Sequence, residues 1–248
     1  CGLLAQIRST CASLKDQKAL FRPAAIGKYG TLSPGTSIPA LDNFTLCIYV
    51  RPTEIIENGM TVFTYNTDRK LYSRFSRNHE LGIMIKDSSL IIWLFGTEIE
   101  LDYVLSLHNW HYLCLTWHSA HHKANIYVNK TQIHTKFLVQ DYKLFPNGSL
   151  LLGQSHKRRP DRLQVDLDMA FVGELYMFNL WNYIKRHQIL NLGCEDGNII
   201  SWNSQQWDFM GLDLEYDYLL PCCKYCRLTA HQISLNPIDC TPNITQSH

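Results

Sequence analysis

The chain has 248 residues, a formal net charge of +1, 46% apolar residues and only 18% charged residues. This composition excludes an intrinsically disordered chain, because it supplies enough apolar side chains to bury a core. The near-neutral charge gives no general attraction to nucleic acid or to a membrane surface, so neither is an expected partner. No apolar run approaches the roughly 18–20 residues of a membrane helix, and no membrane segment is expected within the chain. The chain starts at Cys1 without a signal peptide, as a mature or trimmed segment would.

Short runs rich in β-branched and aromatic residues recur along the chain and are separated by turn residues. Such runs predict β-strands, and their number and spacing predict an all-β fold of two antiparallel sheets, a jelly-roll sandwich. The predicted strands are residues 44–50, 60–65, 81–86, 90–95, 111–117, 124–129, 150–154, 171–181 and 198–203.

One segment breaks the β pattern. Residues 184–192 (IKRHQILNL) carry a rough helical stripe and are followed by Gly193, a residue suited to the end of a helix, so one short helix is predicted. After about residue 205 the pattern loosens into a cysteine-rich tail. We therefore expect an N-terminal segment over 1–19, one domain over 20–226 closed by that tail, and a linker or the start of a stalk over 227–248.

Nine cysteines and four Asn-x-Ser/Thr sequons together favour an extracellular protein, in which thiols oxidise and sequons are used. The odd number of cysteines leaves one free or bonded to another chain, and Cys1 is the candidate. The predicted glycosylation sites are Asn43, Asn129, Asn147 and Asn243.

Residues 111–117 (HYLCLTW) allow three interpretations. Cys114 could be a nucleophile with His111 as its base, but side chains three positions apart on a strand point to opposite faces. The neighbouring His-rich turn at 118–122 could bind a metal, although such turns are more often solvated and metal sites need rigid ligands. Alternatively, Cys114 and Cys47 each lie on the mixed face of a strand whose other face is apolar, so that the two strands could bond across.

The stretch 112–117 (YLCLTW) resembles the pentraxin pattern His-x-Cys-x-Ser/Thr-Trp, with Tyr112 at the histidine position. The stretch 44–47 (FTLC) is similar to the strand that carries the other half of the pentraxin disulfide. Further matches follow in the family's order at 62–65 (VFTY), 151–154 (LLGQ), 172–174 (VGE), 178–181 (FNLW) and 197–202 (GNIISW). The resemblance covers about residues 20–205 and implies the two-sheet jelly roll shared with laminin-G domains and concanavalin-like lectins.

Two details are similar to the pentraxin-like modules at the N-termini of adhesion G-protein-coupled receptors: Trp110 beside His111, and the run 194–198 (CEDGN). In those modules the late cysteine bonds into the C-terminal segment. The resemblance therefore implies that Cys194 pairs with Cys222, Cys223 or Cys226, and we take Cys226 as the working choice.

The family's calcium site departs most from the pattern. Soluble pentraxins place a Glu-Gln-Asp run directly after the Leu-Gly-Gln strand, whereas residues 155–159 here read SHKRR. Calcium prefers oxygen ligands and carboxylate charge, which this run does not supply. An earlier Asp-Asn pair of the family aligns near 78–79 (NH), Asp166 keeps one ligand position, and Met169 fills another. The resemblance thus implies no bound metal and no cofactor.

The same run supplies a candidate ligand patch. Residues 156–162 (HKRRPDR) form an expected exposed turn whose basic side chains could hold sulfated glycans or an acidic protein surface, while the alternative is a merely solvated loop. The patch comprises Lys157, Arg158, Arg159 and Arg162.

Three acids alternate in residues 97–103 (TEIELDY) and therefore share one strand face. Jelly-roll glycoside hydrolases also place acids along one strand, so Glu98 and Glu100 offer an alternative catalytic function. The spacing differs from the Glu-x-Asp-x-x-Glu arrangement of those enzymes, and solvated acids, with Asp102 among them, are the preferred interpretation.

The resemblance implies a non-catalytic recognition or adhesion module, either secreted or part of the ectodomain of a cell-surface receptor such as an adhesion G-protein-coupled receptor. The expected partner is an extracellular protein, matrix component or sulfated glycan that is bound without calcium. The domain itself is a candidate for homo-oligomer formation. The main alternative is a secreted, calcium-dependent pentraxin-like or lectin-like oligomer.

Overall fold

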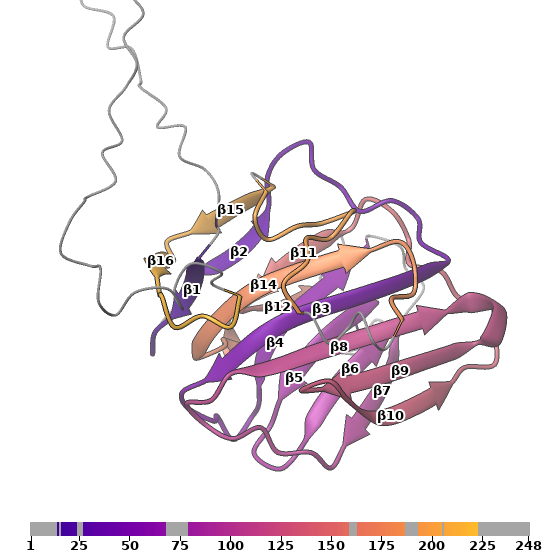
Figure 1. Cartoon of the computed structure of the whole chain (residues 1–248), viewed down its shortest axis with the longest axis horizontal. Coiled ribbons are helices and arrows are strands. Elements are labelled where there is room, and N and C mark those ends of the chain that lie inside the picture. Colours follow the sequence, from indigo (N-terminus) through magenta and orange to yellow (C-terminus); the bar gives the residue numbers. More distant parts are fainter. Residues whose placement is uncertain are drawn as a thin grey trace, which may run out of the picture.

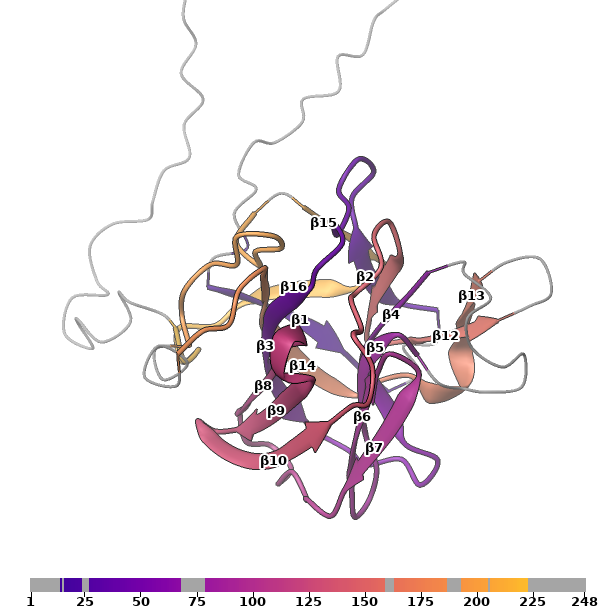
Figure 2. The ribbon, with the colours of Figure 1, turned by 90° about the vertical axis from the view of Figure 1, so that its right-hand side faces the viewer.

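The computed structural model describes residues 14, 16–23, 27–67, 79–158, 163–186, 193–204 and 206–222. Two seven-stranded antiparallel sheets stack face to face, and a two-stranded ribbon lies beside them (Figures 1 and 2). Two short 3-10 turns are the helical elements of the described residues, η1 (Ser119–His121) and η2 (Leu167–Met169). The predicted two-sheet antiparallel sandwich is confirmed.

The first sheet, sheet A, is built around the strand that carries Cys114. In spatial order it contains β10 (Thr131–Phe137), β9 (Lys123–Val128), β8 (His111–His118), β3 (Asn43–Pro52), β14 (Gly173–Trp181), β1 (Gln17–Phe21) and β16 (Asp213–Tyr216).

The second sheet, sheet B, carries the predicted acidic strand at one edge. Its order is β15 (Trp207–Met210), β2 (Tyr29–Leu32), β11 (Ser149–Leu152), β4 (Met60–Asn66), β5 (Leu81–Ile85), β6 (Leu90–Leu94) and β7 (Thr97–Leu101). The separate ribbon pairs β12 (Ser155–Arg158) with β13 (Leu163–Asp166) and lies on the outer side of sheet B (Figure 2).

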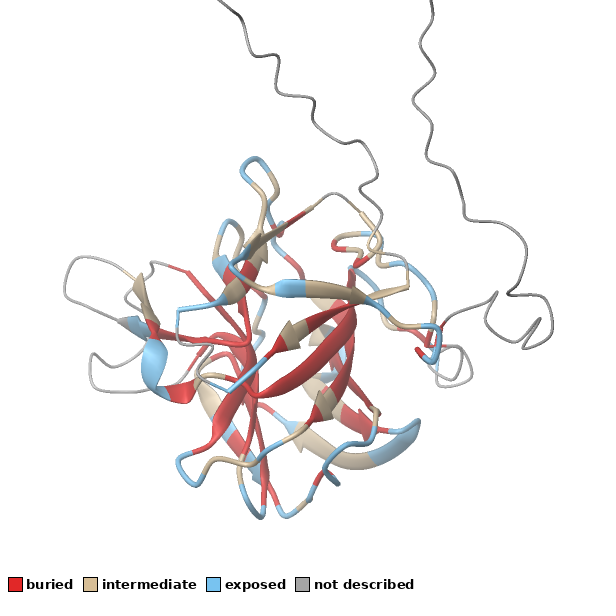
Figure 3. Cartoon of the chain, turned by 90° about the vertical axis from the view of Figure 1, so that its left-hand side faces the viewer, coloured by how far each residue is buried: buried red, intermediate tan, exposed pale blue. Residues whose placement is uncertain are grey.

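The core lies between the inner faces of the two sheets, where apolar side chains alternate along each strand. Phe63 of β4 and Phe178 of β14 meet across this layer with ring centroids 5.2 Å apart. Trp117 is fully buried, and its indole nitrogen donates to the carbonyl of Tyr142 at 3.0 Å. Figure 3 shows strand interiors buried and the turns between them exposed. Burying each large apolar side chain contributes about 1.5–3 kcal/mol to folding.

The outer face of sheet A is also buried at its central strands β8, β3 and β14, because the chain after β14 crosses it (Figure 2). Thr45 of β3 donates its hydroxyl to the carbonyl of Tyr183 at 2.8 Å and accepts from the backbone nitrogen of Lys185 at 2.9 Å. The ammonium of Lys185 in turn pairs with Glu195 at 2.7 Å and lies 4.0 Å from the ring centroid of Trp181. These contacts explain why β8 is buried on both faces at every position except His118.

An ionic network ties the β1 and β16 edge of sheet A to its centre. The Lys18 ammonium donates to Glu174 at 3.0 Å and to Asp217 at 2.9 Å, and Arg51 donates to the other oxygen of Glu174 at 3.0 Å. Burial alone would lower the pKa of Lys18, but its hydrogen bonds and ion pairs with the two acids outweigh burial and raise that pKa. Lys18 therefore stays charged and holds Glu174 and Asp217 together.

Two sequence predictions, the strand over 198–203 and the loosening after residue 205, are wrong, and most of the predicted helix lies outside the described residues. Residues 184–186 at the start of the predicted helix are irregular, and 187–192 lie outside the described residues. The predicted strand 198–203 makes a single bridge, between Ile200 and Leu180. The chain does not loosen after residue 205 either, because β15 and β16 follow and complete an edge of each sheet.

Candidate ligand surface

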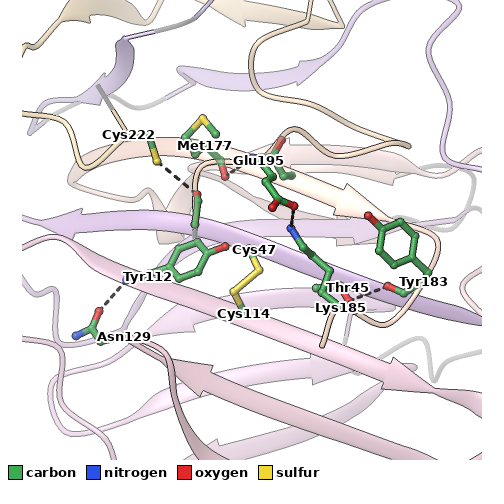
Figure 4. The surroundings of a disulfide bond; sticks show 12 residues. Thr45, Cys47, Tyr112, Cys114, Asn129, Met177, Tyr183, Lys185, Glu195 and Cys222 are labelled. Carbon is green, nitrogen blue, oxygen red and sulfur yellow. Dashed lines mark hydrogen bonds and ion pairs between the residues drawn. A yellow bond between two sulfur atoms is a disulfide. The ribbon is translucent and has the colours of Figure 1, made fainter. Parts of the chain in front are cut away.

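The register of β3 against β8 decides between the three interpretations of Cys114. Cys47 and Cys114 are direct partners on β3 and β8, and their sulfurs are bonded (Figure 4). His111 does not meet this pair, and its Nε2 instead donates to the carbonyl of Ser106 at 2.9 Å. Among the described residues, no three His, Cys, Asp or Glu side chains converge as a metal site requires. Cys114 is therefore a structural half-cystine.

The second disulfide closes the segment that covers sheet A. Cys194 bonds to Cys222, the first of the three candidate partners, rather than to the working choice Cys226. Cys226 itself lies outside the described residues, as do Cys1, Cys11, Cys223 and Cys240. The bond joins the two ends of residues 194–222, which include β15 and β16, and so keeps these edge strands in place.

A buried histidine, His79, lies in a hydrogen-bonded cluster where the resemblance placed an earlier pair of calcium ligands. Asn66 donates its amide nitrogen to His79 Nδ1 at 2.7 Å, and its carbonyl oxygen accepts from the backbone nitrogen of Glu80 at 2.8 Å. This arrangement leaves the proton on His79 Nε2, which donates to Ser155 Oγ at 3.0 Å. The ring also packs edge-on against Trp93, with centroids 4.6 Å apart.

This histidine is held neutral. Burial lowers the pKa of His79 from 6.5 to about 3, because a charged imidazolium would lose its water without gaining a counter-ion. Asn78, which precedes it, lies outside the described residues. A buried imidazole bonded to a serine gives calcium no carboxylate to bind.

Where the resemblance kept Asp166 as a calcium ligand, a lysine ammonium pairs with two acids. Lys157 on β12 lies 3.8 Å from the carboxylate of Asp166 and 3.6 Å from that of Asp168. Asp166 also accepts from the backbone nitrogen of Asp168 at 3.3 Å. The surviving acid predicted at residue 166 is thus paired within the protein. In the rest of the candidate patch, the Arg158 side chain, Arg159 and Arg162 lie outside the described residues.

An apolar cluster on the outer face of sheet B was not predicted. Met84, Ile91, Trp93 and Met169 pack together apart from the main core and line a cavity of about 330 Å³. The strand predicted over 90–95 contained the signal, because Ile91 and Trp93 alternate with residues of the main core and yet are apolar. Met169, predicted at a calcium-ligand position, instead covers this cluster.

The acidic strand forms an edge of sheet B, and Glu98 and Glu100 are exposed, as solvated acids would be. Glu98 on β7 accepts from the Trp93 indole nitrogen at 3.1 Å, and Glu100 accepts from the Ser89 hydroxyl at 2.8 Å. Both acids therefore act as hydrogen-bond acceptors for the neighbouring strand and turn. Glu98 also borders the 330 Å³ cavity, to which it adds a negative rim.

The sequons differ in their surroundings. Asn129 and Asn147 are exposed in turns, with φ angles of +48° and +59°. Asn43 is half-buried, and its side-chain oxygen accepts from the backbone nitrogen of Ser119 at 3.0 Å. Asn243 lies outside the described residues.

The neutral state of His79 predicts a loss of stability in acid. The pKa of His79 is about 3 in the folded chain and 6.5 for an unperturbed histidine, which represents the unfolded chain. Between pH 3 and pH 6.5 the unfolded chain therefore binds one proton more than the folded chain. Stability should therefore fall as pH drops below about 6.5, by about 2 kcal/mol from this group at pH 5. We expect His79→Gln to lose that part of the pH dependence. Urea unfolding of both proteins at pH 7.5 and pH 5 measures it, and equal pH slopes would contradict the buried neutral assignment.

Comparison with known proteins agrees with this geometry. The Pentaxin family model matches residues 18–214. Human adhesion G-protein coupled receptor G4 is 30% identical over 171 residues, which make up 69% of this chain and 5% of the receptor. Mouse pentraxin-related protein PTX3 is 27% identical over 196 residues, which make up 75% of this chain and 49% of that protein. The chain thus spans a small part of the first relative and about half of the second.

Solved structures show the same fold. A heptameric SAP-like pentraxin from Limulus polyphemus superimposes with a TM-score of 0.66 at 16% identity, covering 85% of this chain and 98% of that one. The extracellular region of zebrafish Gpr126/Adgrg6 gives a TM-score of 0.64 at 20% identity, covering 83% of this chain and 27% of that one. The family model spans strands of both sheets, the sequence motifs follow the family's order, and Cys47 is bonded to Cys114. The chain therefore belongs to the Pentaxin family.

Proposed function

We propose that this chain is a non-catalytic, extracellular recognition module of a cell-surface receptor of the adhesion G-protein-coupled type, and that it binds its ligand without calcium. One observation carries the proposal. Where the family's calcium ligands are expected, His79 is bonded to Ser155 and Lys157 is paired with Asp166. Replacing these internal bonds by a cation would leave the lysine and the imidazole beside a positive charge.

The relatives and the covalent structure support the location. Two disulfides close the described fold, which suits an oxidising compartment. The named relatives include a receptor and a pentraxin-related protein. No helix among the described residues is long and apolar enough to cross a membrane. A catalytic role has less support, because Glu98 and Glu100 lie on an exposed edge strand and accept bonds from neighbouring side chains.

The β12–β13 ribbon is the proposed contact for an anionic ligand such as a sulfated glycan. It protrudes from the outer side of sheet B (Figure 2), and the sequence places four basic residues between 157 and 162. Asp166 and Asp168 offset the charge of Lys157 and anchor its side chain. The three arginines outnumber the one remaining acid of the turn, Asp161, and so supply the net positive charge that would attract sulfate groups.

Heparin binding at several salt concentrations, each with calcium and with EDTA, tests the proposal. We expect Arg159→Glu/Arg162→Glu to weaken binding by at least about tenfold, a change of 1.4 kcal/mol. Lys130→Glu/Lys143→Glu makes the same change in net charge at exposed positions outside the ribbon and should have a smaller effect. Binding that needs calcium would contradict the proposed mode. Equal losses in the two variants would remove the ribbon as the contact.

A further inference from the structure

A second cavity, a cleft of about 460 Å³, lies between the outer face of sheet B and the β12–β13 ribbon. Tyr29 and Thr31 of β2 and Leu151 of β11 line it from sheet B, and Gln164 lines it from β13. Its volume falls in the range of about 300–1,000 Å³ that is usual for small-molecule sites. The cleft is separate in its lining from the apolar cavity beside Trp93.

The chemistry of this cleft suits a neutral sugar. The described residues that line it include hydroxyl and amide side chains but no Asp, Glu, Lys or Arg. Among these described residues a charged ligand would lose its water without meeting an opposite charge, which is costly. A sugar instead presents hydroxyl groups and, in N-acetylhexosamines, an amide. The Ser149 hydroxyl can donate or accept there, and the Thr31 oxygen, whose proton goes to the Leu150 carbonyl, can still accept.

The wall of the cleft also carries an attachment point for a sugar. Asn147 lines the cleft, is exposed, and begins the sequon Asn147-Gly148-Ser149. Its backbone is fixed in the left-handed region at φ +59°, and its backbone nitrogen donates to the carbonyl of Ile38 at 3.0 Å. A glycan on this side chain would therefore start at the cleft itself.

We propose that the cleft is occupied by the chain's own N-linked glycan, whose first N-acetylhexosamine units dock from Asn147 onto β2, β11 and β13. The inference rests on the extracellular location given under the proposed function, since the sequon must be used. A docked glycan fills the neutral cleft, so an external ligand must bind elsewhere on the module. The basic ribbon and the apolar cavity remain open to it.

Asn129 supplies a matched control within the same chain. It is also exposed, also at positive φ, and lies in the turn between β9 and β10, but it lines neither of the two cavities. A glycan on Asn129 should therefore extend into solvent. The two sites differ in two ways: a cleft adjoins Asn147, and the side-chain oxygen of Asn129 accepts from the backbone nitrogen of Tyr112 at 2.9 Å.

The test uses the chain secreted from glycosylating mammalian cells and digested with peptide N-glycosidase without denaturant. Mass spectrometry of the glycopeptides follows each site. We expect the Asn147 glycan to be released at least about tenfold more slowly than the Asn129 glycan, since a docked state favoured by 1.4 kcal/mol hides the linkage to that extent. After denaturation the two rates should become equal.

Equal release rates on the folded protein would overturn the docking. An unmodified Asn147 beside a glycosylated Asn129 would also overturn it, while leaving the extracellular location intact. Absence of glycan at both sites would count against both proposals. Loss of a docked glycan should also lower the thermal midpoint of unfolding. Ser149→Ala removes the Asn147 sequon and should lower this midpoint, whereas Ser149→Thr keeps the sequon and should not. Thr131→Ala, which removes the Asn129 sequon, should leave the midpoint unchanged.

Discussion

Removing the central disulfide, in Cys47→Ala/Cys114→Ala, is expected to lower the free energy of unfolding by about 4 kcal/mol. The two cysteines are 67 residues apart, so the bond restricts a long loop of the unfolded chain. Domains of this kind are stable by only about 5–15 kcal/mol, and the loss would consume a large share of that. Urea unfolding followed by tryptophan fluorescence measures it, because Trp117 and Trp181 are buried in the same sheet.

The second disulfide gives the matched comparison. Cys194→Ala/Cys222→Ala opens a separation of 28 residues, for which the same model gives a smaller loss of about 3.6 kcal/mol. We expect the two losses to keep this order and the first variant to lose more of its cooperativity, since β3 and β8 lie at the centre of sheet A. A central variant that unfolds with the stability of the unmodified chain would contradict this assignment.

Replacing Gly153 by alanine is expected to destabilise the fold by about 3 kcal/mol. Gly153 follows β11 at φ +77°, a conformation that costs a residue with a side chain about 1–2 kcal/mol. A Cβ atom there would also overlap the ring of Phe21, which packs against Phe171 with centroids 5.6 Å apart and cannot move aside freely. Overpacking of this kind costs about 1–3 kcal/mol more.

Gly35→Ala separates these two costs. Gly35 has a similar φ of +88°, but a Cβ atom there would have no other group within 4 Å. We expect it to lose about 1–2 kcal/mol, the backbone cost alone. Thermal unfolding of the two variants side by side is the measurement. Equal midpoints would show that the contact with Phe21 is not a constraint on the fold.

Alternation of side chains was a reliable guide where a strand lies inside a sheet. The stretch 111–117 alternates apolar and mixed positions, and the structure turns Trp117 into the core and pairs Cys114 with Cys47. Alternation placed the two cysteines on matched faces, and the family resemblance indicated that the two strands carry a disulfide. The family resemblance then supplied the order of the other strands.

The segments after β14 were harder to predict, because side chains take over the role of strand hydrogen bonds there. Asn179 accepts through one oxygen from the backbone nitrogens of Gly197 at 3.0 Å and Trp202 at 3.2 Å. The residues between them pair with β14 only through the bridge between Ile200 and Leu180, although their pattern is that of a strand. Trp202 is nevertheless fully buried, which explains the apolar signal.

The edge strand β16 was not recognised from the sequence, because its charged residues resemble those of a solvated segment. Asp213 and Glu215 alternate as solvated acids would, but Arg22 pairs with both, at 3.5 and 3.2 Å. These exposed pairs contribute little energy, and the register of β16 on β1 depends also on the buried Lys18–Asp217 contact. A single sequence shows the acids but not the distant bases that they meet.

For the candidate site, the residue types predicted the loss of the calcium ligands better than they predicted the internal contacts that replace those ligands. The run 155–159 lacks the acids of a calcium site, and this was visible in the sequence. The bond from His79 to Ser155 joins residues 76 positions apart, and no local pattern predicts it. The cover that Met169 forms over Trp93 likewise depends on how the ribbon folds back onto sheet B.

Calorimetric titration of the folded chain with calcium at millimolar concentration tests the central claim most directly, together with the thermal midpoint in calcium and in EDTA. The internal bonds of His79 and Lys157 predict no heat of binding and an unchanged midpoint. Ligand that binds the folded state at 100 times its dissociation constant would stabilise it by about 2.7 kcal/mol, a shift that is easily seen. A saturable heat with a raised midpoint in calcium would contradict the account.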